Sequence, residues 1–219
     1  PIADTVTREI YGYEALVRWF HPVRGAVPPT VFIPVAEKIG LINALGEWVL
    51  KTACAEAASW ATPLKVSVNV SPIQLMNTSL TDTIIEVLHQ TGLDPRRLDL
   101  EITESDVFNE NTRSLEILSQ LRELGIQISI DDFGTGYSSL SRLSYFPFDK
   151  IKIDRSFVIN IPEQKDDLDI VRLIISMGKS LHMRIVAEGV ETEEQLASLQ
   201  ALGCDLVQGY LIGKPSPLR

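Results

Sequence analysis

Apolar and polar positions along the 219-residue chain alternate between two repeating patterns. Short β-branched runs predict strands, and the stretches between them repeat apolar residues every three or four positions, which predicts helices. The predicted strands are YGYEALVRW (11–19), VSVNVS (66–71), LDLEIT (98–103), IQISID (126–131), KIKID (150–154), RIVAEGV (184–190) and DLVQGYLI (205–212). This alternation predicts one α/β domain over residues 1–219, and eight such units would close a (β/α)8 barrel. An open doubly wound sheet is the alternative, although its usual glycine-rich first turn is missing.

Helix boundaries are also visible in the sequence. Thr192 and Gln195 form a capping-box pattern, and Gly203 marks the end of the same helix. The segment 30–60 predicts two helices divided near Gly40. The apolar side expected for the second of these helices contains Leu45, Trp48, Val49 and Thr52.

Four of the predicted strands have one apolar face and one polar face. In the strand at 66–71, the valines alternate with Ser67 and Asn69, and in the strand at 98–103 the leucines alternate with Asp99 and Glu101. Strands buried on both faces would be apolar throughout, so a barrel with its polar faces turned inward fits better. The polar residues expected near the carboxyl ends of the strands are Glu14, Asn69, Glu101, Asp131, Lys152, Glu188 and Gln208. Barrel active sites lie at that end.

Four carboxylates grouped in this way would repel one another unless cations compensate their charge. Ligands that are all oxygen atoms suit Mg²⁺, Mn²⁺ or Ca²⁺ better than zinc. Asp131 and Asp132 are adjacent in the sequence. Because successive side chains of a strand point to opposite faces, strand parity alone would direct Asp132 away from the barrel mouth, which is the rim formed by the carboxyl ends of the strands. We expect the strand to end there, with Gly134 and Gly136 allowing a turn that brings both carboxylates to one site. Such a pair suits two metal ions that activate water against a phosphoester.

Composition narrows the possible partners. The net charge of −9 and the absence of a Lys/Arg run disfavour binding to a nucleic-acid polymer or to an anionic membrane. No apolar stretch is long enough to span a membrane, and no export signal is visible. Cys54 and Cys204 fit two buried thiols of a reduced, cytoplasmic protein. Because the chain begins at Pro1 and not at Met, we expect it to be a fragment of a longer multidomain protein.

Several motifs, taken together and in order, closely resemble the EAL domain family of bacterial cyclic di-GMP phosphodiesterases. They are YGYEALVRW, GAVPPTVFIPVAEKIGLI, SVNVSPIQL, LEITES, IDDFGTGYSSL, KIKIDRSFV, VAEGVET and GCDLVQGYLIGKP. The resemblance implies a modified TIM barrel whose first strand runs antiparallel. Family members carry an apolar strand ending in YQP before the position of Pro1. That segment is absent here, so we expect a first strand that is missing or reduced to PIAD.

The resemblance also implies roles for individual residues. The expected metal ligands are Glu14, Asn69, Glu101 and Asp131, with Asp132 as a ligand of the second ion. Lys152 and Glu188 would position and deprotonate the attacking water, and Arg18, Asp154 and Gln208 would contact the substrate. Glu104 would anchor a regulatory loop that contains Phe133, Gly134, Thr135, Gly136 and Tyr137.

The function implied is hydrolysis of cyclic di-GMP to linear pGpG with two Mg²⁺ or Mn²⁺ ions, and Ca²⁺ is expected to inhibit. The resemblance also implies a homodimer and an upstream sensory or GGDEF domain. The main alternative is a receptor that binds cyclic di-GMP without cleaving it. A metal-dependent lyase or aldolase on a barrel is a third hypothesis, supported by fold analogy alone.

Overall fold

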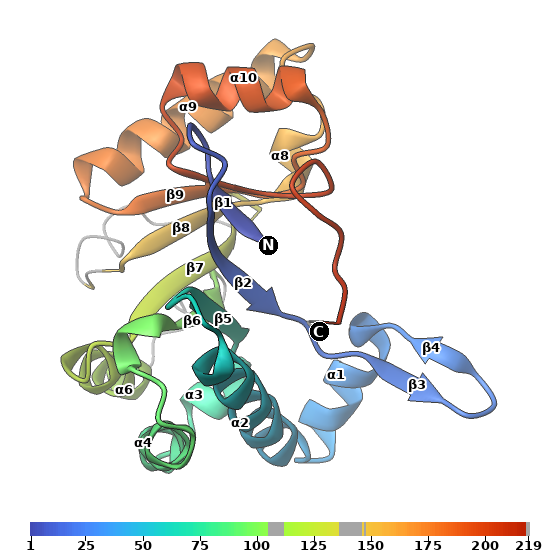
Figure 1. The fold of residues 1–219 in the computed structure, drawn as a ribbon, viewed down its shortest axis with the longest axis vertical. Coiled ribbons are helices and arrows are strands. Elements are labelled where there is room, and N and C mark those ends of the chain that lie inside the picture. The colour runs from blue at the N-terminus through green and yellow to red at the C-terminus, as the bar shows by residue number, and fades with distance from the viewer. Residues whose placement is uncertain (105–111, 136–145, 147, 218–219) are drawn as a thin grey trace.

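A closed eight-stranded barrel forms the centre of the molecule in a computed structural model that describes residues 1–104, 112–135, 146 and 148–217. Its strands are β1 (Ile2–Asp4), β2 (Ile10–Ala15), β5 (Lys65–Asn69), β6 (Leu98–Thr103), β7 (Gln127–Phe133), β8 (Lys150–Ile153), β9 (Arg184–Ala187) and β10 (Leu206–Gln208). They follow the order β1-β10-β9-β8-β7-β6-β5-β2, and β2 pairs back to β1 (Figure 1). The barrel prediction is therefore confirmed, and the open-sheet alternative was wrong.

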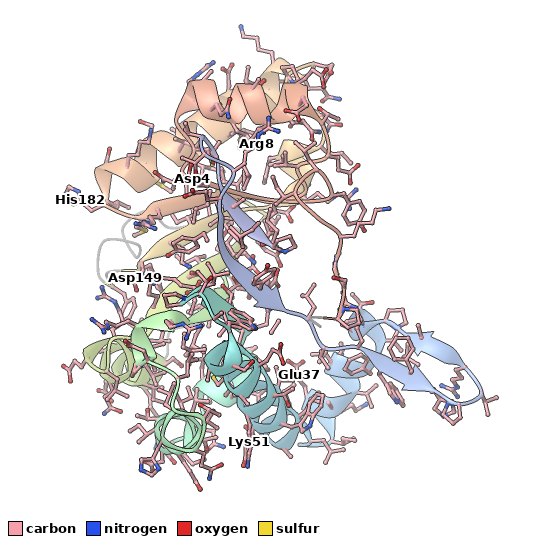
Figure 2. The ribbon with its side chains drawn as sticks, viewed as in Figure 1. Asp4, Arg8, Glu37, Lys51, Asp149 and His182 are labelled. Atoms are coloured by element: carbon pink, nitrogen blue, oxygen red, sulfur yellow. The ribbon has the colours of Figure 1, made fainter. Side chains whose placement is uncertain are left out.

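The helices lie outside the barrel (Figure 1). They are α1 (Pro29–Lys38), α2 (Ile42–Ser59), α3 (Pro72–Leu75), α4 (Leu80–Thr91), α6 (Thr112–Glu123), α8 (Arg155–Val158), α9 (Lys165–Ser180) and α10 (Glu193–Leu202), with a 3₁₀ turn at Pro95–Arg97. Figure 2 shows the side chain of Lys51 pointing away from the barrel on α2. In the described part of the chain, no helix is both long and apolar enough to cross a membrane.

The first strand is short but complete enough to close the barrel. β1 pairs antiparallel with both neighbours, through Ile2 with Gln208 of β10 and through Ile2 with Gly12 of β2. The expected reduced strand at PIAD is therefore present as three residues. The other barrel pairings are parallel.

The second strand is shorter than the sequence predicted. β2 ends at Ala15, and the chain then forms a separate two-stranded hairpin of β3 (Trp19–His21) and β4 (Gly25–Val27). The hairpin projects away from the barrel beside α1 (Figure 1). An edge-on contact between Trp19 and Phe32 of α1, with ring centres 5.7 Å apart, holds the two together. Alternating apolar residues run through both elements, so periodicity alone could not find the boundary.

The sequence predicted the helix boundaries correctly, but it was partly wrong about which side of α2 is buried. Thr192 and Gln195 form both hydrogen bonds of a capping box before α10, and Gly203 ends that helix with φ of 76°. In α2, however, the residues that face the core are Ile42, Gly46, Leu50, Ala53, Cys54 and Ala57. Trp48 is 58% exposed. The small side chains allow close packing that the larger ones would prevent, since a Cβ on Gly46 would lie 1.9 Å from Nε2 of Gln74.

The two faces of the barrel strands behave as their parity predicts. Val66, Val68 and Leu100 face outward and are at most 2% exposed beneath the helices. On the inner face, Asp99 accepts hydrogen bonds from the hydroxyls of Ser67 (3.0 Å) and Ser129 (2.7 Å). It also forms a buried ion pair with Lys150. The inward-facing side chains therefore form a polar layer inside the barrel. This layer lies one inward-facing position before the residues at the carboxyl ends of the strands, which form the mouth of the barrel.

Candidate active site at the barrel mouth

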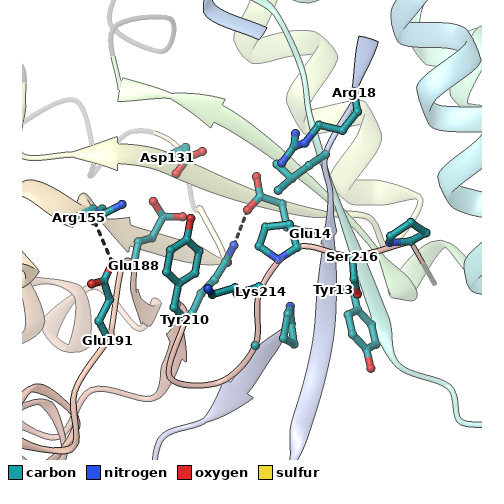
Figure 3. Close-up of a pocket in the computed structure, with 18 of the residues that line it drawn as sticks. Tyr13, Glu14, Arg18, Asp131, Arg155, Glu188, Glu191, Tyr210, Lys214 and Ser216 are labelled. Atoms are coloured by element: carbon teal, nitrogen blue, oxygen red, sulfur yellow. Dashed lines mark hydrogen bonds and ion pairs between the residues drawn. The ribbon is translucent and has the colours of Figure 1, made fainter. Parts of the chain in front are cut away.

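The polar residues that the sequence placed at the ends of different strands come together at one mouth. Their positions are Glu14 on β2, Asn69 at the end of β5, Glu101 on β6, Asp131 and Asp132 on β7, Lys152 on β8, Glu188 directly after β9 and Gln208 at the end of β10. Parallel strands with a common direction present their carboxyl ends at the same rim, which explains the convergence. Figure 3 shows Glu14, Asp131 and Glu188 turned toward one another.

Lys152 stands at the centre of this group. Its Nζ lies 2.7 Å from Oε2 of Glu101, 2.7 Å from Oε1 of Glu188, 3.1 Å from Oδ1 of Asp131 and 3.7 Å from Oε2 of Glu14. The lysine side chain is 2% exposed, and none of the four carboxylates is more than 18% exposed. One ammonium ion thus faces four carboxylates, so negative charge is in excess.

Protonation equilibria reflect this excess of negative charge. Burial alone would lower the pKa of Lys152, but Glu101, Glu188 and the other carboxylates raise it well above its usual value. Burial raises the pKa of Glu101 well above normal and that of Glu188 to about 7, against the opposing effect of Lys152. Glu14 differs because Lys152 and the hydrogen bonds from Gln208 and Asn69 outweigh burial and lower its pKa. Burying this many carboxylates is costly without cations.

Two overlapping carboxylate clusters could each hold a cation. Oxygen atoms of Glu14, Glu101 and Asp131 lie within 4.8 Å of one another, and so do oxygen atoms of Asp131, Asp132 and Glu188. Asp131 belongs to both clusters. The sequence prediction that Asp131 and Asp132 serve one site therefore agrees with the geometry, and their roles as ligands stay predictions.

Asp132 reaches the mouth by a different route from the one predicted. The strand does not end at this residue, because β7 continues to Phe133. Between the pairs Ile130–Ile151 and Phe133–Ile153, β7 contains one more residue than β8, which defines a bulge. Asp132 itself takes the left-handed conformation with φ of 53°. The bulge, and not a turn at the glycines, brings the second carboxylate to the face of the first.

Two amide side chains complete the rim. Nδ2 of Asn69 donates to Oε1 of Glu14 at 2.8 Å, and Nε2 of Gln208 donates to Oε2 of Glu14 at 2.6 Å. Oε1 of Gln208 is buried and has no hydrogen-bond partner among the described residues. An unpartnered buried oxygen beside a carboxylate cluster is a suitable acceptor for a cation, a water molecule or a substrate donor.

The two other predicted substrate contacts lie in different settings. Arg18 lines the same pocket as Glu14 and Glu188. Asp154 caps helix α8 by accepting a hydrogen bond from the backbone N–H of Ser156 at 3.0 Å. Asp154 does not line the pocket, although its charge contributes to the raised pKa of Asp132, after burial and Asp131. A capping role thus explains Asp154 without a ligand, and its substrate contact stays a prediction.

The start of the predicted regulatory loop is tied to the mouth. Oε2 of Glu104 accepts a hydrogen bond from the backbone N–H of Gly134 at 2.9 Å, and Glu104 is 2% exposed. Phe133 is buried, and the hydroxyl of Thr135 donates to the carbonyl of Asp132 at 2.9 Å. A Cβ on Gly134 would lie 2.8 Å from the ring of Phe157. The other two loop positions, Gly136 and Tyr137, lie outside the described residues.

The mouth opens into a cavity of about 610 Å³. Its walls include four side chains that the sequence reasoning did not single out, namely Arg155, Glu191, Tyr210 and Lys214 (Figure 3). Arg155 and Glu191 form an ion pair of 2.9 Å. Tyr210 and Lys214 lie two and six residues after the end of β10, and the signals for them were this position beyond a strand end and their place in the GCDLVQGYLIGKP motif.

Comparison with known proteins gives the family. The family model described as "EAL domain" matches residues 1–215, and the chain belongs to this family. An uncharacterized signaling protein of Caulobacter vibrioides is 56% identical over all of this chain and 27% of its own length. The cyclic di-GMP phosphodiesterase NbdA of Pseudomonas aeruginosa is 45% identical over 100% of this chain and 28% of its own length.

Solved structures agree with this assignment. A structure of PaMucR phosphodiesterase in complex with c-di-GMP has a TM-score of 0.94 and 43% sequence identity, and the match covers 99% of this chain and 90% of that one. The fold is therefore the modified TIM barrel of EAL domains. The chain spans only about a quarter of the length of the curated relatives named above.

Proposed function

We propose that this chain hydrolyses cyclic di-GMP to linear pGpG. The observation that carries the proposal is the arrangement of two carboxylate clusters around Lys152 at the mouth of an EAL-family barrel. Relatives named as cyclic di-GMP phosphodiesterases, NbdA and MucR, support the substrate. A cavity of about 610 Å³ is in the size range of small-ligand pockets.

The residues at the mouth fit divalent cations. The candidate ligand atoms are all oxygens, and the four carboxylates outnumber the ammonium ion of Lys152 at their centre. The buried amide oxygen of Gln208 has no hydrogen-bond partner among the described residues. Glu14, Asn69, Glu101 and Asp131 would hold one ion and Asp132 would hold a second, with Mg²⁺ or Mn²⁺ preferred. Such ions, when bound, acidify water and offset the charge of the phosphate.

The chain's own residues would supply proton transfer and orientation. Glu188, whose pKa is raised to about 7, can accept a proton from the attacking water near neutral pH. Lys152, 2.7 Å from Glu188, would hold that water and the carboxylate in line with the scissile bond. Attack breaks the bond between phosphorus and the 3′ oxygen, which then takes up a proton. Arg18 would bind a phosphate oxygen through its forked donors.

One assay separates hydrolysis from binding alone. The chain is incubated with cyclic di-GMP and Mg²⁺ or Mn²⁺, and formation of pGpG is followed by chromatography. We expect turnover by the unmodified chain and by Lys51→Ala, an exposed control on α2, and a loss of at least about 100-fold in Glu14→Ala and Lys152→Ala. Tight binding of cyclic di-GMP without pGpG would instead support a receptor.

Cation choice gives a second test. Ca²⁺ prefers longer bonds and looser coordination than Mg²⁺, so it should occupy the clusters without supporting turnover. We expect EDTA to abolish activity, Mg²⁺ or Mn²⁺ to restore it, and Ca²⁺ to inhibit in competition with Mg²⁺. Equal turnover in Ca²⁺ alone would contradict this part of the mechanism.

We also propose that this single domain acts in the cytoplasm as a homodimer, within a longer protein that carries an upstream sensory or GGDEF domain. MucR, named as a bifunctional diguanylate cyclase and phosphodiesterase, supports the combination with a second catalytic domain. Sedimentation of the active chain tests the dimer, and a strictly monomeric chain with full activity would contradict it.

A further inference from the structure

Among the described residues, three cationic side chains line the pocket, and their partners differ. Arg155 is neutralised by Glu191 at 2.9 Å. Arg18 donates to the carbonyl of Val17, and Nζ of Lys214 lies 5.3 Å from the centre of the Tyr210 ring. Within the described residues, neither Arg18 nor Lys214 has an ion pair with a carboxylate. Two unneutralised cations therefore face the same cavity.

Lys214 is presented by a tightly fixed piece of backbone. The turn after β10 is joined to the segment after β9, because the N–H of Leu211 donates to the carbonyl of Val190 at 3.0 Å. The turn closes on itself through a bond of 3.0 Å from Gly213 N–H to the carbonyl of Gly209. A Cβ on Gly213 would lie 2.8 Å from the ring of Pro1. The backbone that leads to Lys214 is thus held in place, and the contact with the Tyr210 ring favours one orientation of the lysine side chain.

The substrate of the proposed function has two phosphates, which need two sets of partners. One phosphate must lie at the carboxylate clusters, where hydrolysis occurs. The other lies across the cyclic dinucleotide, and an anion enclosed in a pocket needs a cation or several donors. Figure 3 shows Arg18 and Lys214 on different sides of Glu14, so the two side chains can reach different parts of one ligand.

We propose that Lys214, held against Tyr210, binds the phosphate of cyclic di-GMP that is not hydrolysed. This assignment rests on the proposed function and adds a residue that determines substrate affinity. The contact is remote from the reacting bond and is the same in the ground state and the transition state. Its loss should therefore raise KM and leave kcat nearly unchanged.

The test compares Lys214→Ala and Lys214→Arg with the exposed control Lys51→Ala. We expect Lys214→Ala to raise KM for cyclic di-GMP about tenfold with kcat within about twofold, and to flatten the dependence of KM on salt. Lys214→Arg should restore KM to within about threefold, since the charge is kept. Inhibition by pGpG, which retains the second phosphate, should weaken by the same factor. Inhibition by GMP, which has only one phosphate, should not change.

Different results contradict different parts of this inference. An unchanged KM in Lys214→Ala, or equal weakening of pGpG and GMP, would overturn the assignment and leave the proposed function intact. A changed preference between cyclic di-GMP and cyclic di-AMP would assign Lys214 to the base and overturn the phosphate contact. If the unmodified chain neither hydrolyses cyclic di-GMP nor binds it in Ca²⁺, the proposed function fails and this assignment fails with it.

Discussion

The buried ion pair below the mouth offers a quantitative test of the barrel interior. Lys150 and Asp99 are 2% and 1% exposed, and Asp99 also accepts hydrogen bonds from Ser67 and Ser129. In Lys150→Met, a side chain of similar length fills the same space but leaves Asp99 without its counter-ion. Removing one partner of a buried pair typically costs about 3–5 kcal/mol of unfolding free energy. Because the two hydroxyls still bind Asp99, we expect the lower end, about 3 kcal/mol.

For a domain of this size, about 3 kcal/mol corresponds to a fall in Tm of about 6–12 °C. Thermal unfolding followed by circular dichroism measures it, with the exposed Lys51→Met as the matched control. The double variant Asp99→Asn with Lys150→Met should recover most of the loss, because it removes both buried charges. A fall of less than about 2 °C in the single variant would show that Asp99 does not need Lys150 as its counter-ion.

The pH dependence of this difference follows from Lys150. Burial acts to lower the pKa of Lys150, but Asp99, Tyr11 and Glu101 together outweigh burial and hold that pKa above its usual value. A lysine whose pKa is raised in the folded state stabilises at all pH values below its unfolded pKa and loses that contribution as pH rises through the folded pKa. The difference in Tm between the unmodified chain and Lys150→Met should therefore stay constant from pH 6 to pH 9. A difference that disappears by pH 9 would mean that Lys150 is already neutral there.

Three further predictions concern the second cation, the mouth and the helix faces. Asp132→Asn should keep Tm within about 2 °C, since Asn tolerates the left-handed backbone, and weaken the second Mn²⁺ seen by calorimetry; unchanged turnover would count against the two-cation scheme. The cation-free chain should lose stability from pH 5 to pH 8. Burial raises the pKa of Glu188 to about 7, so the folded state keeps this proton at pH values where the unfolded state has lost it. Mn²⁺ should abolish this dependence of Tm on pH, and a rise in Tm from pH 5 to pH 8 would contradict the prediction. In urea unfolding, Trp48→Ser should lower the free energy of unfolding by less than about 1 kcal/mol, and Leu50→Ala should lower it by about 2–5 kcal/mol. The reverse order would mean that the side of α2 that contains Trp48, as the sequence predicted, is the buried one.

The sequence was sufficient for the barrel and for the residues at its mouth. Strand parity in short runs such as 66–70 and 98–102 assigns each side chain to one face, and that assignment does not depend on distant contacts. Because parallel strands share a direction, the residues at their ends must meet at one rim, and Glu101 and Lys152 do so. The motifs gave the family, which the match over residues 1–215 confirms.

Only the tertiary structure decided features that depend on register or on segments distant in the sequence. The bulge that brings Asp132 beside Asp131 is a mismatch between β7 and β8, and no pattern within β7 reveals it. Apolar residues of α2 occur outside its buried side as well, Trp48 among them, and the close approach of Gly46 to Gln74 helps to fix which side is buried. Lys214 was visible in the sequence only as the lysine of the GCDLVQGYLIGKP motif, without a role of its own. It becomes a candidate for binding substrate only because the turn after β10 folds back over the mouth, where the fold leaves its charge without a carboxylate partner among the described residues.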